Sequence, residues 1–285
     1  MRHSFLVIRL RLLLVGFHLL SGALQVALLY PFGGSTGRQC LKRAWSRQLL
    51  ALLGIRVEVV DGGLGGIKNG LLVCNHISFI DIFVLNALLP SGFVAKSDVA
   101  RWPLIGWLSR RNDTIFIERG SRKAAHNTQR NMLAAMDAGK RLVVFPEGTT
   151  TAGDRLLPFH AALFQSAIDA AVPVHAICLG YHGADGLRSA APAYIDDISL
   201  VACMAAVLRT RRLVVRINLA GSFTPPLPER RLLAHRAHQA VAAAQAQGQN
   251  FAAIPGRPDF GPWISGADPC LGSPQPFGNE AAIRR

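Results

Sequence analysis

Short runs of β-branched and aliphatic residues alternate with helical stretches along most of this 285-residue chain. Because parallel strands need a long crossover between them, such alternation favours an α/β domain. We therefore predict a mixed, largely parallel sheet flanked by helices. The strands are expected at 55–60, 71–74, 93–95, 115–117, 142–145, 172–179 and 213–219. The helices are expected at about 79–89, 121–138 (capped by Ser121, with Gly139 just past its end), 159–170 and 228–247.

The N-terminal segment is basic and apolar, with no Asp or Glu among its first 57 residues. Its apolar run, 12–30, is about long enough to cross a hydrocarbon core as a helix. Arg and Lys flank both ends of this run, so a helix that dips into one leaflet is as consistent with the sequence as a spanning helix. A cleaved signal peptide is disfavoured because residues 31–34 lack the usual small-residue cleavage site.

A second helix is expected at 38–53, where apolar residues recur at helical spacing between basic ones. This pattern is typical of an amphipathic helix at a membrane interface, and also of a surface helix packed on a domain. The apolar run before it favours the membrane interface. The apolar members are Leu41, Trp45, Leu49, Leu52 and Leu53, and the basic members are Arg38, Lys42, Arg43 and Arg47.

The net charge of +14 favours an anionic membrane, an acidic substrate or nucleic acid as partner. Basic residues interleaved with apolar helix point to lipid. No zinc-finger pattern or RNP-like aromatic strand is present, so we do not expect nucleic acid to bind. A non-enzymatic basic membrane protein remains an alternative that rests on charge alone. The five cysteines show neither CxxC pairs nor zinc-ligand spacing, so we predict no metal site and a reduced, cytoplasmic catalytic domain.

Residues 71–81 indicate a buried strand, a polar turn and the beginning of a helix, with His76 in the turn and Asp81 after it. Strand ends are where open α/β sheets place their sites. A neutral imidazole can accept a proton near pH 7, and a carboxylate on its other nitrogen would fix the tautomer. In a regular helix, residues five apart differ by about 140° in direction, so the turn must bend the two together. Taken alone, a His in a strand–helix turn is more often a structural or capping residue than a catalytic one.

The segment 75–81 is also the first of several motifs in which the sequence resembles the glycerolipid acyltransferase family, from about residue 55 to 220. That motif is a His followed by four residues and an Asp. The second, an apolar strand ending in Arg, resembles 115–119, and the third matches 145–149, Phe-Pro-Glu-Gly-Thr. Between the first two, 93–97 and the Trp-Pro and Gly-Trp pairs at 102–103 and 106–107 are similar to family members.

The resemblance implies an enzyme that moves a fatty acyl group from acyl-CoA or acyl carrier protein to the hydroxyl of a lysolipid, without a further cofactor. His76 and Asp81 would be catalytic, and Arg119 would bind the phosphate or other anionic head of the acceptor. The other substrate-binding candidates are Lys96, Glu147, Gly148 and Thr149, the last three shaping the acceptor pocket. Lys96 is otherwise a surface cation, Arg119 a solvated strand end and Glu147 a cap. We expect an inner or cell membrane enzyme whose catalytic domain faces the cytoplasm.

Two departures from the family pattern bear on the acceptor and on the acyl pocket. The third motif commonly continues with Arg and Ser, where this chain has Thr150 and Thr151. A missing guanidinium weakens the case for a phosphate-bearing acceptor, and Thr-Thr resembles the branch that acylates lyso-ornithine lipid. The fourth motif has Ala176 in place of the usual Pro, and its His175 is expected to be a structural strand residue.

The domain organisation follows from these patterns: membrane-associated helices at 1–54, an acyltransferase domain at 55–249, and a Pro- and Gly-rich tail at 250–285 that we expect to be disordered. One alternative class comes from residues 33–37, which match the G-x-S-x-G pattern of serine esterases around Ser35. That motif needs a strand before it and a helix after it. Here an apolar helix precedes it, so we interpret 33–37 as a turn between two helices.

Overall fold

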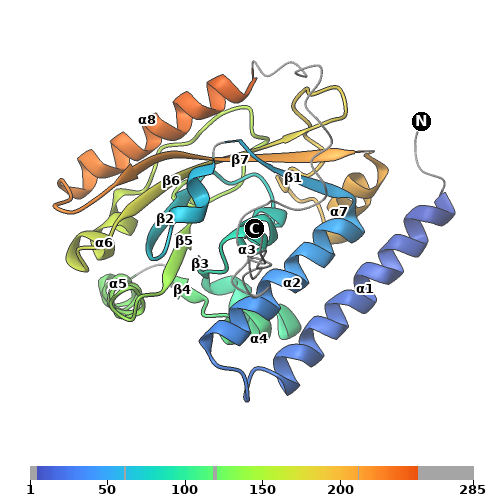
Figure 1. Cartoon of the computed structure of the whole chain (residues 1–285), viewed down its shortest axis with the longest axis horizontal. Helices are drawn as coiled ribbons and strands as arrows, with labels where there is room; N and C mark the ends of the chain where they lie inside the picture. The colour runs from blue at the N-terminus through green and yellow to red at the C-terminus, as the bar shows by residue number, and fades with distance from the viewer. Residues whose placement is uncertain (1–4, 61, 118–120, 211, 250–285) are drawn as a thin grey trace, which may run out of the picture.

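The computed structural model describes residues 5–60, 62–117, 121–210 and 212–249, which form a seven-stranded sheet with helices on both faces (Figure 1). The strand order is β1-β7-β6-β2-β5-β3-β4. The strands are β1 (Ile55–Val59), β2 (Gly70–Cys74), β3 (Gly92–Lys96), β4 (Ile115–Ile117), β5 (Arg141–Val144), β6 (Val174–His182) and β7 (Leu213–Phe223). The predicted α/β class and the order of its strands along the chain are confirmed.

Strand direction makes the sheet mixed. β6, β2, β5, β3 and β4 are mutually parallel, whereas β7 is antiparallel to β6 and β1 is parallel to β7. β6 and β7 both run longer than predicted, to His182 and Phe223, because they pair with each other from Val174↔Phe223 to His182↔Val214. Long-range pairing, which a local pattern does not report, therefore sets the length of these two strands.

The helices cover the two faces of the sheet in separate groups (Figure 1). Side chains alternate between faces along a strand, so Leu72 and Cys74 of β2 pack with α2, α3 and α7, whereas Leu71 and Val73 pack with α5, α6 and α8. The helices are α1 (Phe5–Leu28), α2 (Ser35–Leu53), α3 (Ile80–Leu88), α4 (Pro103–Arg111), α5 (Arg122–Asp137), α6 (Gln165–Asp169), α7 (Leu200–Arg209) and α8 (Arg230–Gln249). Short 3₁₀ turns lie at Gly62–Gly66, Ser97–Arg101 and Ala161–Phe164.

Helix ends agree with local sequence chemistry where a cap is present. The Ser121 side chain accepts a hydrogen bond from Ala124 N at the start of α5, and Gly139 follows the helix with φ of 73°, as predicted. The stretch predicted as one helix at 159–170 is divided into a 3₁₀ turn and α6. The prediction missed α4 and α7, although α4 begins with Pro and α7 is capped by Ser199.

The N-terminal helices α1 and α2 pack side by side (Figure 1). His18, a polar interruption in the apolar run, is buried against Trp45, with the two rings stacked 4.7 Å apart. His18 Nε2 lies 3.0 Å from Trp45 O, and Trp45 Nε1 donates to His18 O at 3.1 Å. His18 Nε2 and Trp45 Nε1 thus find their hydrogen-bond partners between the two helices.

Helix α2 is part of the core, since Leu49, Leu50 and Leu53 are buried with the residues of α3. Packing of 38–53 on the domain is thus observed, and its place at a membrane interface stays a prediction. Three basic side chains of α2 donate to backbone carbonyls at or just after the end of α3, where a helix leaves acceptors unsatisfied. The contacts are Arg47 Nε to Ala87 O, Arg43 Nη2 to Leu88 O, and Lys42 Nζ to Ser91 O.

Candidate active site

The candidate site lies at the edge of the sheet where the five parallel strands end. Because their carboxyl ends share one edge, the residues that follow β2, β5 and β3 come together there. His76 follows β2, Glu147 follows β5, and Lys96 is the last residue of β3. The predicted motifs are therefore assembled by the order of the strands.

Asn75 makes the transition from strand to turn. Its side-chain Nδ2 donates to Leu179 O, and its Oδ1 accepts from Leu179 N, both at 2.9 Å. The side-chain amide of Asn75 thus makes the hydrogen bonds that the next pair of backbone groups would make between β2 and β6. With these bonds made by a side chain, the backbone at His76 can leave the sheet and bend toward α3.

The bend brings His76 and Asp81 into contact. His76 Nδ1 lies 2.9 Å from Asp81 Oδ2, and the same oxygen accepts from Ile77 N at 2.8 Å and Ser78 N at 2.9 Å. Oδ2 therefore holds both the imidazole and the turn that carries it. The turn therefore brings the two residues together, as the sequence analysis required of a catalytic pair. If Nδ1 carries the proton that Asp81 accepts, Nε2 is the basic nitrogen of His76.

The two members of this pair differ in exposure. The Asp81 side chain is fully buried, whereas 19% of the His76 side chain is exposed. The His76 ring stacks on Phe145 with ring centroids 3.8 Å apart. A buried carboxylate behind a partly exposed imidazole is the arrangement expected of a general base and the acid that orients it.

The second oxygen of Asp81 accepts a hydrogen bond from Tyr181 OH at 2.6 Å. Tyr181 lies in β6, 100 residues along the chain, and is fully buried. Burial, and then the charge of Asp81, raise the pKa of Tyr181 well above its ordinary value, so the phenol remains a proton donor.

Glu147 supports the backbone of His76. Its Oε1 accepts from His76 N at 2.8 Å and its Oε2 from Leu157 N at 2.9 Å, while the residue is 5% exposed. Burial raises the pKa of Glu147, an effect that these two backbone donors partly offset. Glu147 thus holds the turn that carries His76, while the part that the family resemblance implies for it in binding the acceptor stays a prediction.

The residues after Glu147 form a turn that joins the same site. Gly148 has φ of 71°, and a Cβ there would lie 3.2 Å from His160 Nε2, so both conformation and space favour glycine. Thr149 is exposed. Thr151 N donates to His76 O at 2.9 Å, which ties this turn to the one that carries the histidine.

The remaining predicted residues make no hydrogen bond to the pair within the described residues, or lie outside them. Lys96 is exposed at the end of β3, where it is paired in register with Ile117 of β4. Arg119 lies outside the described residues, as does the tail predicted at 250–285. His175 is a β6 residue whose Nδ1 is hydrogen-bonded with Ser222 Oγ, which agrees with the structural role predicted for it.

The esterase alternative lacks its strand–turn–helix geometry. Ser35 is the first residue of α2, and it is preceded by α1 and a turn rather than by a strand. The prediction that all of 33–37 forms a turn was wrong in detail, since α2 begins at Ser35. Near the candidate pair, Cys74 is fully buried, and burial raises the pKa of its thiol, which disfavours a thiolate nucleophile.

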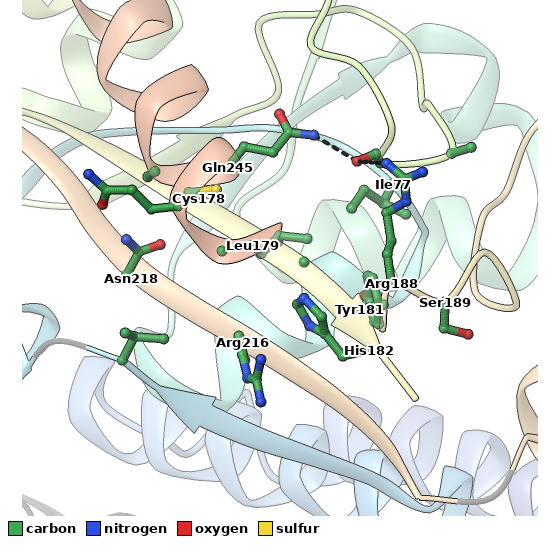
Figure 2. Close-up of a pocket in the computed structure, with 17 residues that line it drawn as sticks. Ile77, Cys178, Leu179, Tyr181, His182, Arg188, Ser189, Arg216, Asn218 and Gln245 are labelled. Atoms are coloured by element: carbon green, nitrogen blue, oxygen red, sulfur yellow. Dashed lines mark hydrogen bonds between the residues drawn. The ribbon is translucent and has the colours of Figure 1, made fainter. Parts of the chain in front are cut away.

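A cavity of about 140 Å³ lies beside the turn that carries His76, between β6, β7 and α8 (Figure 2). Ile77 and Tyr181 line it, whereas His76 and Asp81 do not. Gln245 of α8 and Arg188 both donate to Gly153 O next to the cavity (Figure 2). These bonds tie α8 and the loop after β6 to the turn that follows Thr151.

Sequence reasoning missed Asn75 as a structural element of the turn, Phe145 as the surface on which the imidazole stacks, and Tyr181 as a partner of Asp81. The first two lie inside or next to recognised motifs, so their positions were a usable signal. Tyr181 carried no comparable signal, because the predicted strand ended at 179 and its partner is 100 residues away.

Comparison with known proteins agrees with this geometry. A sequence model of the family described as Acyltransferase matches residues 60–180. The fold is similar to the crystal structure of the 1-acyl-sn-glycerophosphate acyltransferase from Thermotoga maritima, with a TM-score of 0.61 and 18% sequence identity. The similarity covers 84% of this chain and 97% of that structure.

Two curated relatives are closer in sequence. The 1-acyl-sn-glycerol-3-phosphate acyltransferase of Neisseria meningitidis serogroup B is 37% identical over 172 residues, 60% of this chain and 67% of the relative. The lyso-ornithine lipid O-acyltransferase of Pseudomonas aeruginosa is 38% identical over 207 residues, 73% of this chain and 79% of the relative. The resemblance inferred from the motifs is thereby confirmed, and the chain belongs to the acyltransferase family.

Proposed function

We propose that the protein transfers a fatty acyl group from acyl-CoA or acyl carrier protein to the hydroxyl of a lysolipid of the 1-acylglycerol-3-phosphate type. The observation that carries the proposal is the 2.9 Å contact between His76 Nδ1 and buried Asp81 Oδ2. This contact supports a role for the other ring nitrogen, Nε2, as a general base. Both donors are anionic, which is consistent with the net charge of +14.

In the proposed mechanism, His76 Nε2 takes the proton of the acceptor hydroxyl as that oxygen attacks the thioester carbonyl. The carbonyl becomes a tetrahedral oxyanion, while Asp81 stabilises the imidazolium that forms. When the intermediate collapses, the carbon–sulfur bond breaks and the imidazolium returns its proton to the leaving thiolate. Because His76 activates the acceptor directly, the reaction needs no acyl-enzyme.

The direct test is to incubate the purified protein with labelled acyl-CoA or acyl carrier protein and a panel of lysolipids. Mass spectrometry of the products then identifies the acceptor and the donor together. Transfer to at least one lysolipid is expected. Release of free fatty acid in place of any acylated lipid would instead support a hydrolase.

Lyso-ornithine lipid is a second candidate acceptor. It is the substrate named for the Pseudomonas aeruginosa relative, which this chain matches over 79% of its length. The side chain of Thr150, at the position where the family commonly has Arg, donates to the backbone oxygen of Tyr194 and carries no charge for a phosphate. Lyso-ornithine lipid has no phosphate, so this substitution favours it.

The substitution Thr150→Arg discriminates between the two acceptors. For a phosphate acceptor, an added guanidinium contributes roughly 1.5 to 3 kcal/mol when well placed, which raises kcat/KM by about ten-fold or more. For lyso-ornithine lipid, the same cation repels the head-group amine. The measurement is the ratio of kcat/KM for lysophosphatidic acid to that for lyso-ornithine lipid, at fixed ionic strength.

Thr150→Ala is the matched control, since it removes the contact with Tyr194 O without adding a charge. Its acceptor ratio is expected to equal that of the wild-type protein. An acceptor ratio that is the same for Thr150→Arg as for Thr150→Ala would show that a cation at position 150 does not reach the acceptor head.

We also propose that α1 holds the enzyme at the inner or cell membrane, with the catalytic domain on the cytoplasmic side. Within the described residues, Leu6–Leu28 is the helix long and apolar enough to cross a membrane. One face of α1 packs on the protein, and the other exposes a stripe of large apolar side chains at helical spacing. This stripe is Leu6, Leu10, Leu13, Phe17, Leu20, Leu24 and Leu28.

Replacing Leu13, Phe17 and Leu20 together by Glu is expected to release the protein from membranes without unfolding it, because all three are more than 60% exposed. Losing three inserted side chains should weaken binding to phosphatidylethanolamine–phosphatidylglycerol vesicles by at least about 100-fold in a flotation assay. The control places three Glu on α5, at exposed Asn127, Asn131 and Ala134. If the α1 variant still floats with the vesicles, α1 is not the anchor.

A further inference from the structure

We infer that Tyr181 is a positioning residue of the acyl transfer, because its hydroxyl holds Asp81 in the orientation that the histidine requires. The inference rests on the proposed function. Tyr181 OH donates to Asp81 Oδ1 at 2.6 Å, on the side of the carboxylate opposite to His76. Tyr181 does not touch the imidazole, so it acts through Asp81.

The hydrogen bonds of Asp81 are divided unequally between its oxygens. Oδ2 accepts from His76 Nδ1, Ile77 N and Ser78 N. In the part of the chain that the structure describes, Oδ1 accepts from Tyr181 OH, and no Lys or Arg forms an ion pair with this carboxylate. Tyr181 is thus the side-chain donor that both fixes rotation of the carboxylate and takes up part of its charge.

Tyr181 is itself held in the core, away from solvent. It is 1% exposed, and it packs in the core formed by α2, α3 and α7. Its ring also lines the cavity beside the turn (Figure 2). Because burial raises the pKa of its phenol, Tyr181 supplies a donor across the working pH range.

Other ionisable groups around Asp81 do not replace this donor. Cys74 of β2 and Cys203 of α7 are buried thiols whose pKa values are raised by burial, so they stay neutral. Glu147, in the loop after β5, is an acid whose oxygens accept from His76 N and Leu157 N. Only His76 and Tyr181 join Asp81 through side-chain hydrogen bonds within the described residues.

Tyr181→Phe tests the inference by removing one oxygen and keeping the ring. Without the Tyr181 donor, more negative charge stays on Asp81, and the imidazolium is stabilised relative to the neutral base. The acidic limb of kcat/KM against pH is therefore expected to move up by about half to one pH unit. Looser orientation lowers kcat by about ten-fold, with little change in KM.

Tyr30→Phe is the matched control. Tyr30 is also buried, and its hydroxyl donates to Asn112 Oδ1 at 2.9 Å, away from the candidate pair. The same chemical change there is expected to leave the pH profile in place. A second variant at the site, 3-fluorotyrosine at position 181, keeps the hydroxyl but makes it a stronger donor, so it should move the acidic limb to lower pH.

A double-mutant cycle shows whether Tyr181 acts through Asp81. In an Asp81→Asn background, the further change Tyr181→Phe is expected to lower kcat by less than about two-fold, because the charge that it tunes has been removed. A full ten-fold effect in both backgrounds would mean that Tyr181 acts elsewhere. These measurements are made per folded protein, with the folded fraction taken from thermal unfolding.

Failure of this inference is distinct from failure of the proposed function. If His76→Ala abolishes transfer while Tyr181→Phe and 3-fluorotyrosine both leave kcat and the acidic limb at wild-type values, the positioning role is overturned and the general base stands. If His76→Ala keeps wild-type activity, the proposed function itself is wrong.

Discussion

His76→Ala is expected to lower kcat for acyl transfer by about 1,000-fold. The substitution removes the imidazole whose Nδ1 contacts Asp81 Oδ2 and whose Nε2 is proposed to accept the proton of the acceptor hydroxyl. The fold should persist, because the ring is partly exposed and its main loss is the stacking on Phe145, worth about 1 kcal/mol. The measurement is kcat, together with the midpoint of thermal unfolding.

Two controls accompany this prediction. Ser35→Ala should leave turnover unchanged, since Ser35 is an exposed residue at the start of α2. Membrane binding of His76→Ala should also match wild type, because α1 is untouched. Near wild-type transfer by His76→Ala would exclude the general base, whereas a large loss for Ser35→Ala with normal folding would revive the esterase alternative.

Asp81→Asn is expected to lower kcat by about 100- to 1,000-fold while the turn stays formed. The remaining carbonyl oxygen of Asn can keep the bonds that Oδ2 accepts from Ile77 N and Ser78 N. The negative charge that stabilises the imidazolium is lost, and the tautomer of His76 is no longer fixed. The free energy of unfolding should fall by about 1 to 3 kcal/mol. The amide nitrogen of Asn would face the Tyr181 hydroxyl, so the hydrogen bond that Asp81 Oδ1 accepts from Tyr181 is lost.

Asp81→Ala separates charge from structure in this prediction. It removes all four hydrogen bonds of the carboxylate, so we expect a larger loss of stability than for Asp81→Asn and a comparable loss of kcat per folded protein. The comparison uses denaturant unfolding and steady-state kinetics on the same preparations. If Asp81→Asn turned over at the wild-type rate, the charge of Asp81 would have no part in catalysis.

Most of the α/β domain could be predicted from local sequence because its elements carry strong periodic patterns. Buried strands such as β2 are continuous apolar runs, and α5 has both its Ser121 cap and Gly139 beyond its end. Helix α7 is a short run of 10 mostly apolar residues, and it was missed although the side chain of Ser199 caps its start. The Pro and Gly residues of α4 likewise resemble a loop.

The candidate site could be predicted only where its residues share a motif. His76 and Asp81 are five residues apart, so a single motif was enough to predict the pair. The strand–turn–helix pattern around them indicated that the intervening turn could bend. The basic residues of α2 were assigned to a membrane interface, whereas Lys42, Arg43 and Arg47 donate to carbonyls at the end of α3. A charge pattern alone does not reveal which acceptor a cation will meet.

Local sequence was enough to predict the α/β class, the motifs of the acyltransferase family and the pair His76 and Asp81, because these depend on periodicity and on residues close in the chain. Three features depend instead on the folded arrangement: Tyr181 donates to Asp81, Glu147 holds the backbone of His76, and β7 runs antiparallel to β6. These features join segments about 40 to 100 residues apart. Such contacts form when strand order brings distant residues to one edge of the sheet, and local sequence does not encode that order.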